Sequence, residues 1–433
     1  MPSMALVNFF STRRLVSAVA VALALLAAGC AGGPDRAWHW PRFTPHASEN
    51  MPRASHNRIV FDHACKLTSR HFHDPAFGGR DWPAIREKFR VEALAARNTG
   101  ELYDTLNAML GELGSSHATA IPPDIVRMQK TVRDDAVSLS GYVSLKLPGL
   151  EMPVVYEVTP GGPAAEAGIR RGWLEAGRMQ RAAPDTPVRE GEVVRQDFID
   201  EHDTPRTVTM TLRAVPGPGA GKTAELLPGG VLHLRFDRFD GASARWVREQ
   251  LKAHGALGAG LRGVVLDLRL NGGGQVAACR RVLGEFFTTP AGAGAFIDRR
   301  GRATAVEARA GGRSARYTGP LAVLVARMSG SGAEVFAAAI QETNRGVIVG
   351  STSTGRTAGA VLMSMDFPLP GGGRLQLPVR NFRTAAGARL EGAGVRADVE
   401  APLPTVASLR AGEDPALARA VEAVLALAGA SNF

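Results

Sequence analysis

Two strand–turn–helix segments constrain the fold of this chain more than any other feature. The first, residues 321–340, begins with an apolar run typical of a buried strand, passes through a Ser-Gly-Ser-Gly turn at 329–332 and ends in good helix formers. The second, residues 263–287, runs from another apolar strand through three glycines at 272–274 into a helix. Strands and helices that alternate in this way predict an α/β layered core.

Turns of this kind can carry catalysis. A serine between glycines at the start of a helix is free of steric bulk, and the helix N-terminus stabilises negative charge that develops beside it. Free backbone N–H groups in a glycine turn can donate to an oxyanion. Taken singly, each turn is more often structural, because a Gly-Ser turn usually only caps its helix. Two such turns in one α/β region, with a candidate histidine elsewhere, favour an active site.

Length and charge narrow the class of protein. A chain of 433 residues with 45% hydrophobic content can form two or three domains with ample core. The net charge is +10, but the basic residues are interleaved with acids, and no basic run contains interleaved aromatic residues. This pattern argues against nucleic-acid binding, and a basic surface that meets acidic components of a cell envelope is an equally good interpretation.

The N-terminus has the pattern of an export signal. Arg13 and Arg14 precede an apolar run, 15–28, that is too short to span a membrane permanently. The run ends in Leu-Leu-Ala-Ala-Gly-Cys, which predicts a signal peptide over 1–29 and resembles the bacterial lipobox. That resemblance implies lipid attachment at Cys30 and a membrane partner. The alternative is a plain signal peptide with a chance cysteine, and the twin arginine leaves the export route open.

Two further segments precede the β-rich part of the chain. Residues 30–57 are rich in Pro, Arg, His and Ser and predict a tether. Residues 58–124 predict a helical subdomain, with one helix from 58, a second over 82–97 and a third from 99 to 113.

Two histidines and two cysteines are candidates for metal binding or for a disulfide. His71 and His73 are spaced like a strand-type metal pair, but no third ligand cluster stands out, so we predict no metal. Cys65 and Cys279 could pair in an exported protein, although cysteines so placed are more often buried small apolar residues.

Residues 136–215 predict a small β domain. Short β-like runs at 154–158 and 206–213 flank the stretch 158–172, which reads as a strand, a Pro-Gly loop and a short Ala-rich helix closed by glycine. This stretch resembles the PDZ domain, which implies a peptide-binding fold. Trp173 stands where the family usually has Asp, and the following segment is longer than in the family.

The remainder, 225–433, follows a Gly-Pro linker and alternates strands with helices. The expected strands are 231–236, 264–268, 321–326 and 347–350, with a hairpin around 370–373, and the expected helices are 241–254, 275–287 and 414–428.

The order of motifs resembles one known family. After the helical unit come SSH at 115–117 and the PDZ-like insert, then LDLRLNGGG at 266–274, SGSGAE at 329–334, VGSTSTG at 349–355 and LEGAGVRADVE at 390–400. This order is similar to that of the tricorn and C-terminal processing proteases, a family of serine peptidases. The resemblance covers residues 58 to the C-terminus and implies a multidomain α+β fold whose catalytic core is a ClpP/crotonase-like α/β spiral.

The resemblance also assigns a nucleophile and its base. The family nucleophile lies three residues before Glu334, which is Ser331 and not Ser329. One branch of the family uses a lysine base, but Arg356 stands at that position, a guanidinium stays protonated, and no lysine follows Lys252.

The tricorn branch uses instead a histidine that precedes the PDZ domain, and His117 matches it. A histidine can accept the serine proton at neutral pH and return it to the leaving amine. Ser116 and Glu391 match the residues that complete the set in that branch, and we expect Glu391 to hold the imidazole tautomer, directly or through Ser116.

The oxyanion donors implied are the backbone N–H groups of Gly332 and Gly273. Gly272 stands where many relatives have Pro, which leaves the register between Gly272 and Gly273 open. We expect the Ser331 Oγ at an exposed turn, and the Ser329 hydroxyl directed elsewhere.

The sequence therefore predicts a serine endopeptidase or carboxyl-terminal processing peptidase that faces the periplasm of the bacterial cell envelope. Its partners are protein or peptide substrates, no cofactor is implied, and the oligomeric state stays open. Ala31 replaces an Asp that would resemble an inner-membrane retention signal, which favours the outer membrane. Two rivals remain: a catalytically silent PDZ-type scaffold, and a thioester enzyme on a crotonase-like core, against which the lack of a recognisable CoA-phosphate loop argues.

Overall fold

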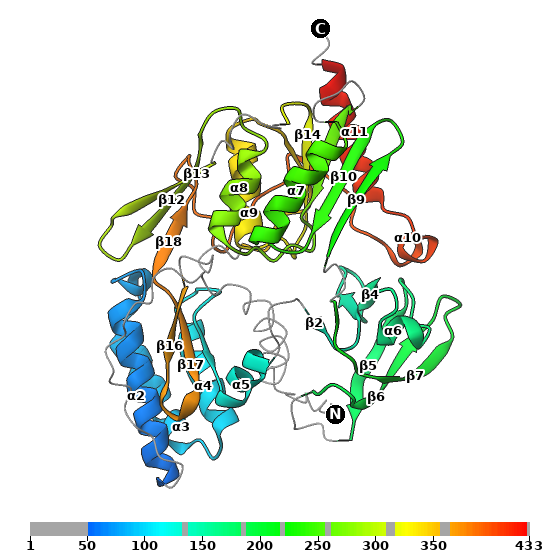
Figure 1. Cartoon of the computed structure of the whole chain (residues 1–433). Coiled ribbons are helices and arrows are strands. Elements are labelled where there is room, and N and C mark those ends of the chain that lie inside the picture. Colours follow the sequence, from blue (N-terminus) through cyan, green and yellow to red (C-terminus); the bar gives the residue numbers. More distant parts are fainter. Residues whose placement is uncertain are drawn as a thin grey trace, which may run out of the picture.

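The computed structural model describes residues 51–131, 137–182, 188–216, 221–255, 261–308, 317–355 and 364–430. Within them the chain forms a helical unit, a five-stranded antiparallel sheet and a six-stranded sheet flanked by helices (Figure 1). The predicted mixed α+β organisation with an N-terminal helical region is confirmed. The signal peptide, Cys30, most of the tether and Arg356 lie outside the described residues.

The helical unit contains α2 (Arg53–His71), α3 (Trp82–Ala95) and α4 (Thr99–Gly111), with a short 3₁₀ turn, η2 (Phe77–Gly79), between the first two. The predicted end of the tether at residue 57 is wrong, because α2 already begins at Arg53. Asn57 is fully buried, and its amide donates to the carbonyls of Leu94 and Ala96 at 3.3 and 2.8 Å. These contacts join segments that are distant in the sequence. The polar composition of residues 53–57 therefore gave no local indication that the helix begins there.

A hairpin from much later in the chain completes the core of the helical unit. It consists of β16 (Ser364–Pro368), η3 (Pro370–Gly372) and β17 (Arg374–Pro378), as the turn at 370–373 predicted. β17 pairs antiparallel with β1 (Thr119–Ile121), which precedes α5 (Pro123–Thr131). Apolar side chains of the hairpin pack among the helices: Phe367, Leu369, Leu375 and Leu377. The hairpin therefore fixes the segment directly before β1 against the C-terminal part of the chain (Figure 1).

The five-stranded sheet has the order β3-β4-β5-β6-β7. Its elements are β3 (Tyr142–Leu145), β4 (Val154–Val158), α6 (Pro163–Glu166), β5 (Leu174–Arg181), β6 (Val193–Ile199) and β7 (Pro205–Thr211), with β2 (Val137–Ser138) and β8 (Val215–Pro216) paired beside it. The strand, loop and short helix expected over 158–172 are present. Trp173 packs into its core, which explains an apolar ring at this position.

The six-stranded sheet has the order β19-β15-β14-β11-β10-β9 and is parallel except for β9. Its strands are β9 (Lys222–Leu227), β10 (Val231–Phe236), β11 (Gly263–Asp267), β14 (Leu321–Val325), β15 (Val347–Gly350) and β19 (Val399–Glu400). One face packs on α7 (Gly241–Ala253), α8 (Val276–Gly284) and α9 (Gly332–Glu342), and the other on α11 (Pro415–Ala430). This is the layered core that the alternating pattern predicted.

Two smaller elements tie the units together. A three-stranded sheet flanks the core and consists of β12 (Ala291–Asp298), β13 (Ala303–Ala308) and β18 (Arg380–Arg383). The second element, α10 (Val406–Ala411), packs against the five-stranded sheet. Its Arg410 guanidinium donates to the carbonyls of Gly172 and Asp200 at 3.2 and 2.8 Å. Cys65 and Cys279 are both buried and free, so they do not form a disulfide.

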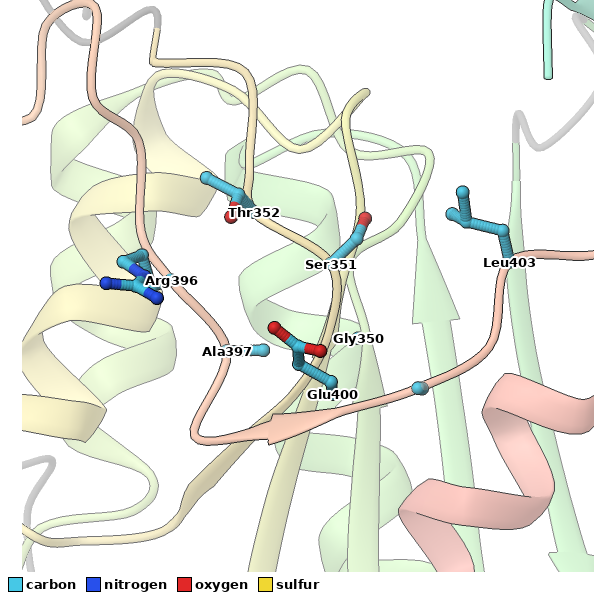
Figure 2. A pocket seen from close by; sticks show the side chains of 8 residues that line it. Gly350, Ser351, Thr352, Arg396, Ala397, Glu400 and Leu403 are labelled. Atoms are coloured by element: carbon cyan, nitrogen blue, oxygen red, sulfur yellow. The ribbon is translucent and has the colours of Figure 1, made fainter. Parts of the chain in front are cut away.

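The β19 edge of the six-stranded sheet borders a cavity of about 290 Å³ (Figure 2). The labelled side chains around it come from the end of β15 and from the segment around β19, and they include Ser351, Arg396 and Glu400. Asp398 fixes this edge, because its carboxylate accepts hydrogen bonds from the Ile348 N–H at 2.8 Å and the Gln341 amide at 2.5 Å.

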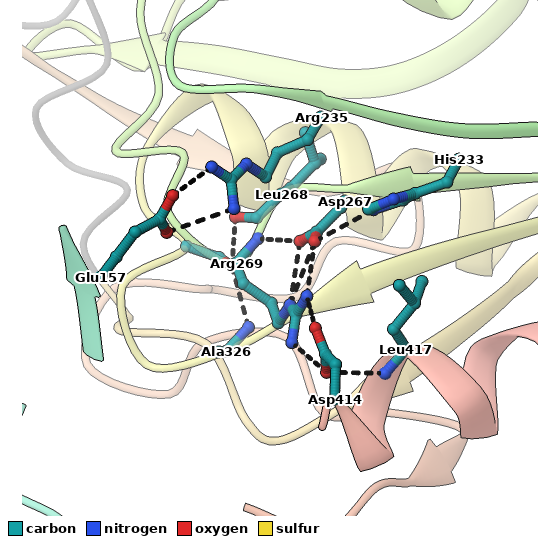
Figure 3. A network of polar contacts seen from close by, with 10 residues as sticks. Glu157, His233, Arg235, Asp267, Leu268, Arg269, Ala326, Asp414 and Leu417 are labelled. Atoms are coloured by element: carbon teal, nitrogen blue, oxygen red, sulfur yellow. Dashed lines mark hydrogen bonds and ion pairs between the residues drawn. The ribbon is translucent and has the colours of Figure 1, made fainter. Parts of the chain in front are cut away.

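A buried polar network holds the end of β11 (Figure 3). The Arg269 guanidinium donates to Asp267 at 2.7 Å and to both carboxylate oxygens of Asp414 at 2.8 and 2.7 Å, which anchors the start of α11. His233 Nε2 lies 3.3 Å from Asp267. Burial alone would raise the pKa of Asp267, but the Arg269 charge outweighs it and holds that pKa well below its usual range.

The same region is joined to the five-stranded sheet by an ion pair between Arg235 on β10 and Glu157 on β4. Both side chains are largely buried, with 24% and 18% exposed. Arg235 therefore links two units that are separate in the sequence, directly beside the network of Asp267 and Arg269 (Figure 3).

We predict that Asp267→Asn lowers the free energy of unfolding by about 3 kcal/mol at pH 7, because it removes one carboxylate from a buried guanidinium. The folded-state pKa of Asp267 lies below its unfolded value, so the stability it contributes is present at neutral pH and is lost as pH falls below about 4. Urea unfolding of both proteins at several pH values should show a gap that narrows below that pH. A gap that is constant with pH would contradict the assignment.

Candidate active site

Ser331 occupies a strained turn between β14 and α9. Its backbone has φ 52° and ψ −113°, a region that costs a non-glycine residue about 1–3 kcal/mol and that occurs mostly at functional sites. The expectation of an exposed turn was wrong, because Ser331 is only 4% exposed. Gly273 lies directly against it, since a Cβ at Gly273 would come within 2.5 Å of the Ser331 Cβ. The Ser331 Oγ has no hydrogen-bond partner in the described part of the chain.

Ser329, the other serine of this turn, has a structural role. It is fully buried, its Oγ donates to the Leu268 carbonyl at 2.8 Å, and the same oxygen accepts the Ala326 N–H at 2.9 Å. The hydroxyl thus joins the ends of β11 and β14. Both of its hydrogen-bonding functions are used, so of the two serines only Ser331 has an uncommitted hydroxyl.

The glycine turn after β11 is held by Asn271. Its side-chain amide donates to the Phe236 carbonyl at 3.0 Å, its Oδ1 accepts the Gly273 N–H at 2.9 Å, and its carbonyl accepts the Gly330 N–H at 3.1 Å. Asn271 therefore binds the glycine turn to the serine turn. Gly272 is exposed, and within the described residues its N–H and that of Gly332 have no hydrogen-bond partner.

Glu334 is a fully buried carboxylate beneath the serine turn. Its Oε2 accepts the Ser331 N–H at 3.0 Å, and its Oε1 accepts the Ser353 hydroxyl and the Gly355 N–H, both at 2.6 Å. From the sequence, Glu334 served only to locate the nucleophile three residues before it. The Ser-x-x-Glu spacing of a capping box was the signal that it contacts the Ser331 backbone, but its contacts with residues 353 and 355 have no local signal.

His117 lies in a second hydrogen-bonded group. The Ser116 Oγ is 2.7 Å from His117 Nδ1, and the Ser116 N–H donates to Glu391 Oε1 at 2.8 Å. Ser116 and Glu391 are 275 positions apart in the sequence. The loop that carries Glu391 is fastened to the Glu334 group, because the Gly392 N–H donates to the Gly355 carbonyl at 2.7 Å and the Val395 N–H to the Ser353 Oγ at 2.8 Å.

Residues of the serine turn and of the His117 group line one cavity of about 610 Å³. Ser116, His117, Gly272 and Ser331 all line it. Ser331 and His117 share no direct hydrogen bond, since the Ser331 Oγ has no partner. The residues that the sequence singled out at positions far apart thus face one space that can hold a substrate.

No group of three or more His, Cys, Asp or Glu side chains suited to a metal ion occurs among the described residues. A search of the same residues finds no helix with both the length and the apolar character needed to cross a membrane.

Two protein-family models match the chain. The model of peptidase family S41 matches residues 230–401, and the model of the tricorn protease C1 domain matches residues 54–111. The first covers every strand of the six-stranded sheet except β9, together with both turns of the candidate site, and the second covers the helices α2 to α4.

Curated relatives and solved structures agree with these matches. A chloroplastic C-terminal processing peptidase of Tetradesmus obliquus is 27% identical in an alignment of 387 positions that covers 79% of this chain and 77% of the relative. A carboxyl-terminal-processing protease of Picosynechococcus is 25% identical over 78% of this chain and 82% of the relative. The structure of the photosystem II D1 C-terminal processing protease superposes with a TM-score of 0.57 at 23% identity, over 86% of this chain and 97% of that one. Mature CPAF complexed with lactacystin gives a TM-score of 0.62 at 12% identity, over 88% and 99%, so these two structures are similar in fold.

We predict that Glu334→Gln lowers the rate at which a fluorophosphonate labels Ser331 by about 100-fold, the scale of a small misplacement of a reacting group. A glutamine oxygen can still accept from Ser353 and Gly355, but its NH₂ group then faces the Ser331 N–H, and two donors meet. Labelling rates measured by intact mass, with circular dichroism to verify folding, test this.

The matched control is Glu342→Gln, the same change near the end of α9, where the carboxylate accepts the Ala386 N–H at 2.9 Å. It should label at the wild-type rate. Equal rates in the two variants would show that Glu334 does not position Ser331.

Proposed function

We propose that this chain is a serine peptidase of the tricorn and C-terminal processing protease family, with Ser331 as its nucleophile and His117 as its general base. The observation that carries this proposal is the pairing of a strained, buried Ser331 whose Oγ has no partner with a His117 whose Nδ1 is already engaged, both facing one cavity. A reactive serine needs such a hydroxyl, because one that is already hydrogen-bonded to carbonyls is less able to transfer its proton to a base.

The proposed acylation step follows from the contacts of His117. With Nδ1 held by Ser116, the other ring nitrogen, Nε2, receives the proton as the Ser331 Oγ attacks the substrate carbonyl. Glu391 accepts the Ser116 N–H and so keeps Ser116 and the ring in place, while its charge favours the imidazolium that forms. The imidazolium then protonates the leaving amine, and water completes the reaction by the reverse sequence.

The oxyanion would form beside the two glycine turns. The Gly332 N–H at the start of α9 supplies one donor, assisted by the positive end of the helix. The second donor belongs to the turn of Gly272 and Gly273. There Gly272 lines the cavity, and Gly273 lies against Ser331 with its N–H held by Asn271.

The remaining units fit the delivery of a peptide. We propose that 136–215 is a PDZ-like domain, that 53–124 together with the hairpin at 364–378 forms the N-terminal subdomain, and that 225–433 contains a ClpP/crotonase-like spiral core. Support comes from the antiparallel sheet with α6 and from cavity walls that all three contribute. The substrates are then proteins or peptides threaded between these units. We also propose that 1–29 is a signal peptide, 30–52 a tether and Cys30 the lipid anchor of a periplasm-facing lipoprotein of the outer membrane.

We predict that Ser331→Ala abolishes both peptide hydrolysis and fluorophosphonate labelling while the protein stays folded. Ser329→Ala should retain labelling at Ser331, although it leaves the Leu268 carbonyl and the Ala326 N–H unpaired and lowers the free energy of unfolding by about 1–3 kcal/mol. The measurement is intact-mass and peptide mapping after labelling, beside a peptide-library assay.

The same experiment separates the rival functions. A folded wild type that neither takes the label nor cleaves any peptide would support the silent peptide-binding scaffold. Label on Ser329 would mean that the nucleophile has been assigned to the wrong serine of the turn.

We predict that Cys30→Ala moves the protein from the membrane fraction to the soluble envelope fraction, because one or two acyl chains supply the anchor. Mass spectrometry of the wild-type N-terminus should detect lipid on Cys30. A wild type without lipid, in the presence of a mutant that stays on the membrane, would contradict this proposal.

A further inference from the structure

Three histidines of α2 border the contact between this helix and the hairpin of β16 and β17. They are His56, His63 and His71, which are seven and eight positions apart, so their side chains lie on one side of the helix. The hairpin lies beside α2 (Figure 1), and apolar residues of both elements share one core. Groups that can take up a proton near neutral pH therefore edge the packing that holds the hairpin in place.

Two of the rings contact the strand β16. The ring of His71 stacks on that of Phe367, with the centroids 4.6 Å apart. The ring of His63 lies against the backbone carbonyl of Pro368, to which it can donate a hydrogen bond. Both contacts can be made by a neutral imidazole.

The third ring contacts the tip of the hairpin, because a Cβ at Gly371 would come within 2.9 Å of the His56 Nε2. From this tip the chain returns as β17, which pairs with β1. Only Ala118 separates His117 from β1. The contact of the hairpin with α2 therefore supports the segment that carries the proposed general base.

The charged groups that act on the three rings are all cations, and they come from α2 and from the β12–β13 turn: Arg53, Lys66, Arg70 and Arg299. The acidic residues of α2, α4 and the hairpin have other partners: Asp62 with Arg90 at 2.8 Å, Glu101 with Arg97 at 2.8 Å, and Asp366 with Arg374 at 3.3 Å. Asp124 of α5 acts on Tyr103 instead. Within the described residues no carboxylate acts on the three rings, so an imidazolium there would meet only like charge.

The sign of the pH dependence follows from these surroundings. Burial, with these cations, lowers the pKa of all three imidazoles in the folded protein, although the Asn57 side chain offsets part of the effect at His56. The stability that the neutral rings contribute is present above the unfolded-state pKa of about 6.5 and is lost as the pH falls below it. His73, beyond the end of α2, differs because Asp74 and Glu391 offset part of the effect of the cations near it.

We propose that His56, His63 and His71 are positioning residues of the active site, which hold the hairpin, and through β1 His117, only while their rings are uncharged. The contact is then a reversible pH-sensitive latch. Protonation places like charges along one side of α2, the hairpin loosens from the helix, and His117 loses its fixed place in the cavity. This inference rests on the proposed function, because it takes His117 as the general base.

Hydrogen exchange of the wild-type protein measures the latch directly. Mass spectrometry of peptides that contain residues 364–378 gives the protection of the hairpin at about pH 7.5 and about pH 5.5, after correction for the intrinsic exchange rate. We expect this protection to fall by about tenfold at the lower pH, while peptides of the six-stranded sheet keep theirs.

A variant with neutral side chains tests the three rings. In His56→Gln/His63→Gln/His71→Phe, the glutamine at 63 can still donate to the Pro368 carbonyl and the phenylalanine at 71 can still stack on Phe367. This triple variant should keep the protection of the hairpin at both pH values.

A permanent charge tests the same contact in the opposite direction. His63→Lys should show low protection of the hairpin already at the higher pH. The matched control is His202→Lys, the same change at an exposed histidine in the β6–β7 turn, which should behave as the wild type. Circular dichroism verifies folding, and the triple variant decides the question by itself if His63→Lys does not fold.

The rate at which a fluorophosphonate labels Ser331 connects the latch with the site. Each rate is expressed relative to the rate of the same protein at the higher pH. Titration of a single base lowers the rate by at most about tenfold per pH unit. We expect a steeper fall in the wild type and a fall of the single-base size in the triple variant.

The outcomes separate this inference from the proposed function. Equal protection of the wild-type hairpin at both pH values would overturn the inference, and so would a loss that persists in the triple variant. A loss spread evenly over all peptides would mean global acid unfolding and would overturn it as well. A wild type that takes no label at the higher pH would refute the proposed function instead, and the hydrogen exchange of the hairpin would still decide whether the latch exists.

Discussion

The proposed site depends on one buried carboxylate. Glu334 accepts hydrogen bonds from the Ser331 N–H on one side and from Ser353 and Gly355 on the other, at 3.0, 2.6 and 2.6 Å. Because Ser353 and Gly355 also hold the loop of Glu391, a single side chain relates the nucleophile turn to the group that orients His117. A carboxylate buried without such donors would be costly, so these donors and the strained conformation of Ser331 stabilise one another.

The fold supplies the second constraint, which is to bring His117 to this place. Only Ala118 separates Ser116 and His117 from β1, and β1 pairs with β17 in the hairpin that completes the helical core. The hairpin in turn lies in the chain between the loop after β15 and the strand β18 that leads to Glu391. Packing of apolar residues such as Phe367 and Leu375 therefore matters for the proposed reaction, because it determines the position of His117 relative to the core.

Much of this architecture could be predicted from the sequence, because it depends on the pattern of apolar and turn-forming residues within each short segment. The bounds of β4, β10 and β15 coincide with apolar runs, and the helices after the two glycine turns follow from composition. The family resemblance added an ordered set of candidate residues. What escaped prediction depends on contacts between distant segments: the start of α2 at Arg53, the network around Arg269, the burial of Ser331 and the second role of Glu334. None of these leaves a local signal, since the partners are brought together only by the fold.

The most direct test of the account is the structure of the protein after reaction with a peptide-like phosphonate. We predict a covalent bond between phosphorus and the Ser331 Oγ, with His117 Nε2 about 3 Å from that oxygen and Nδ1 still held by Ser116. The phosphonyl oxygen should accept the Gly332 N–H and one N–H of the 272–273 turn. An adduct in which the ring of His117 points out of the cavity, with another base such as a second histidine beside the Ser331 Oγ, would contradict the account.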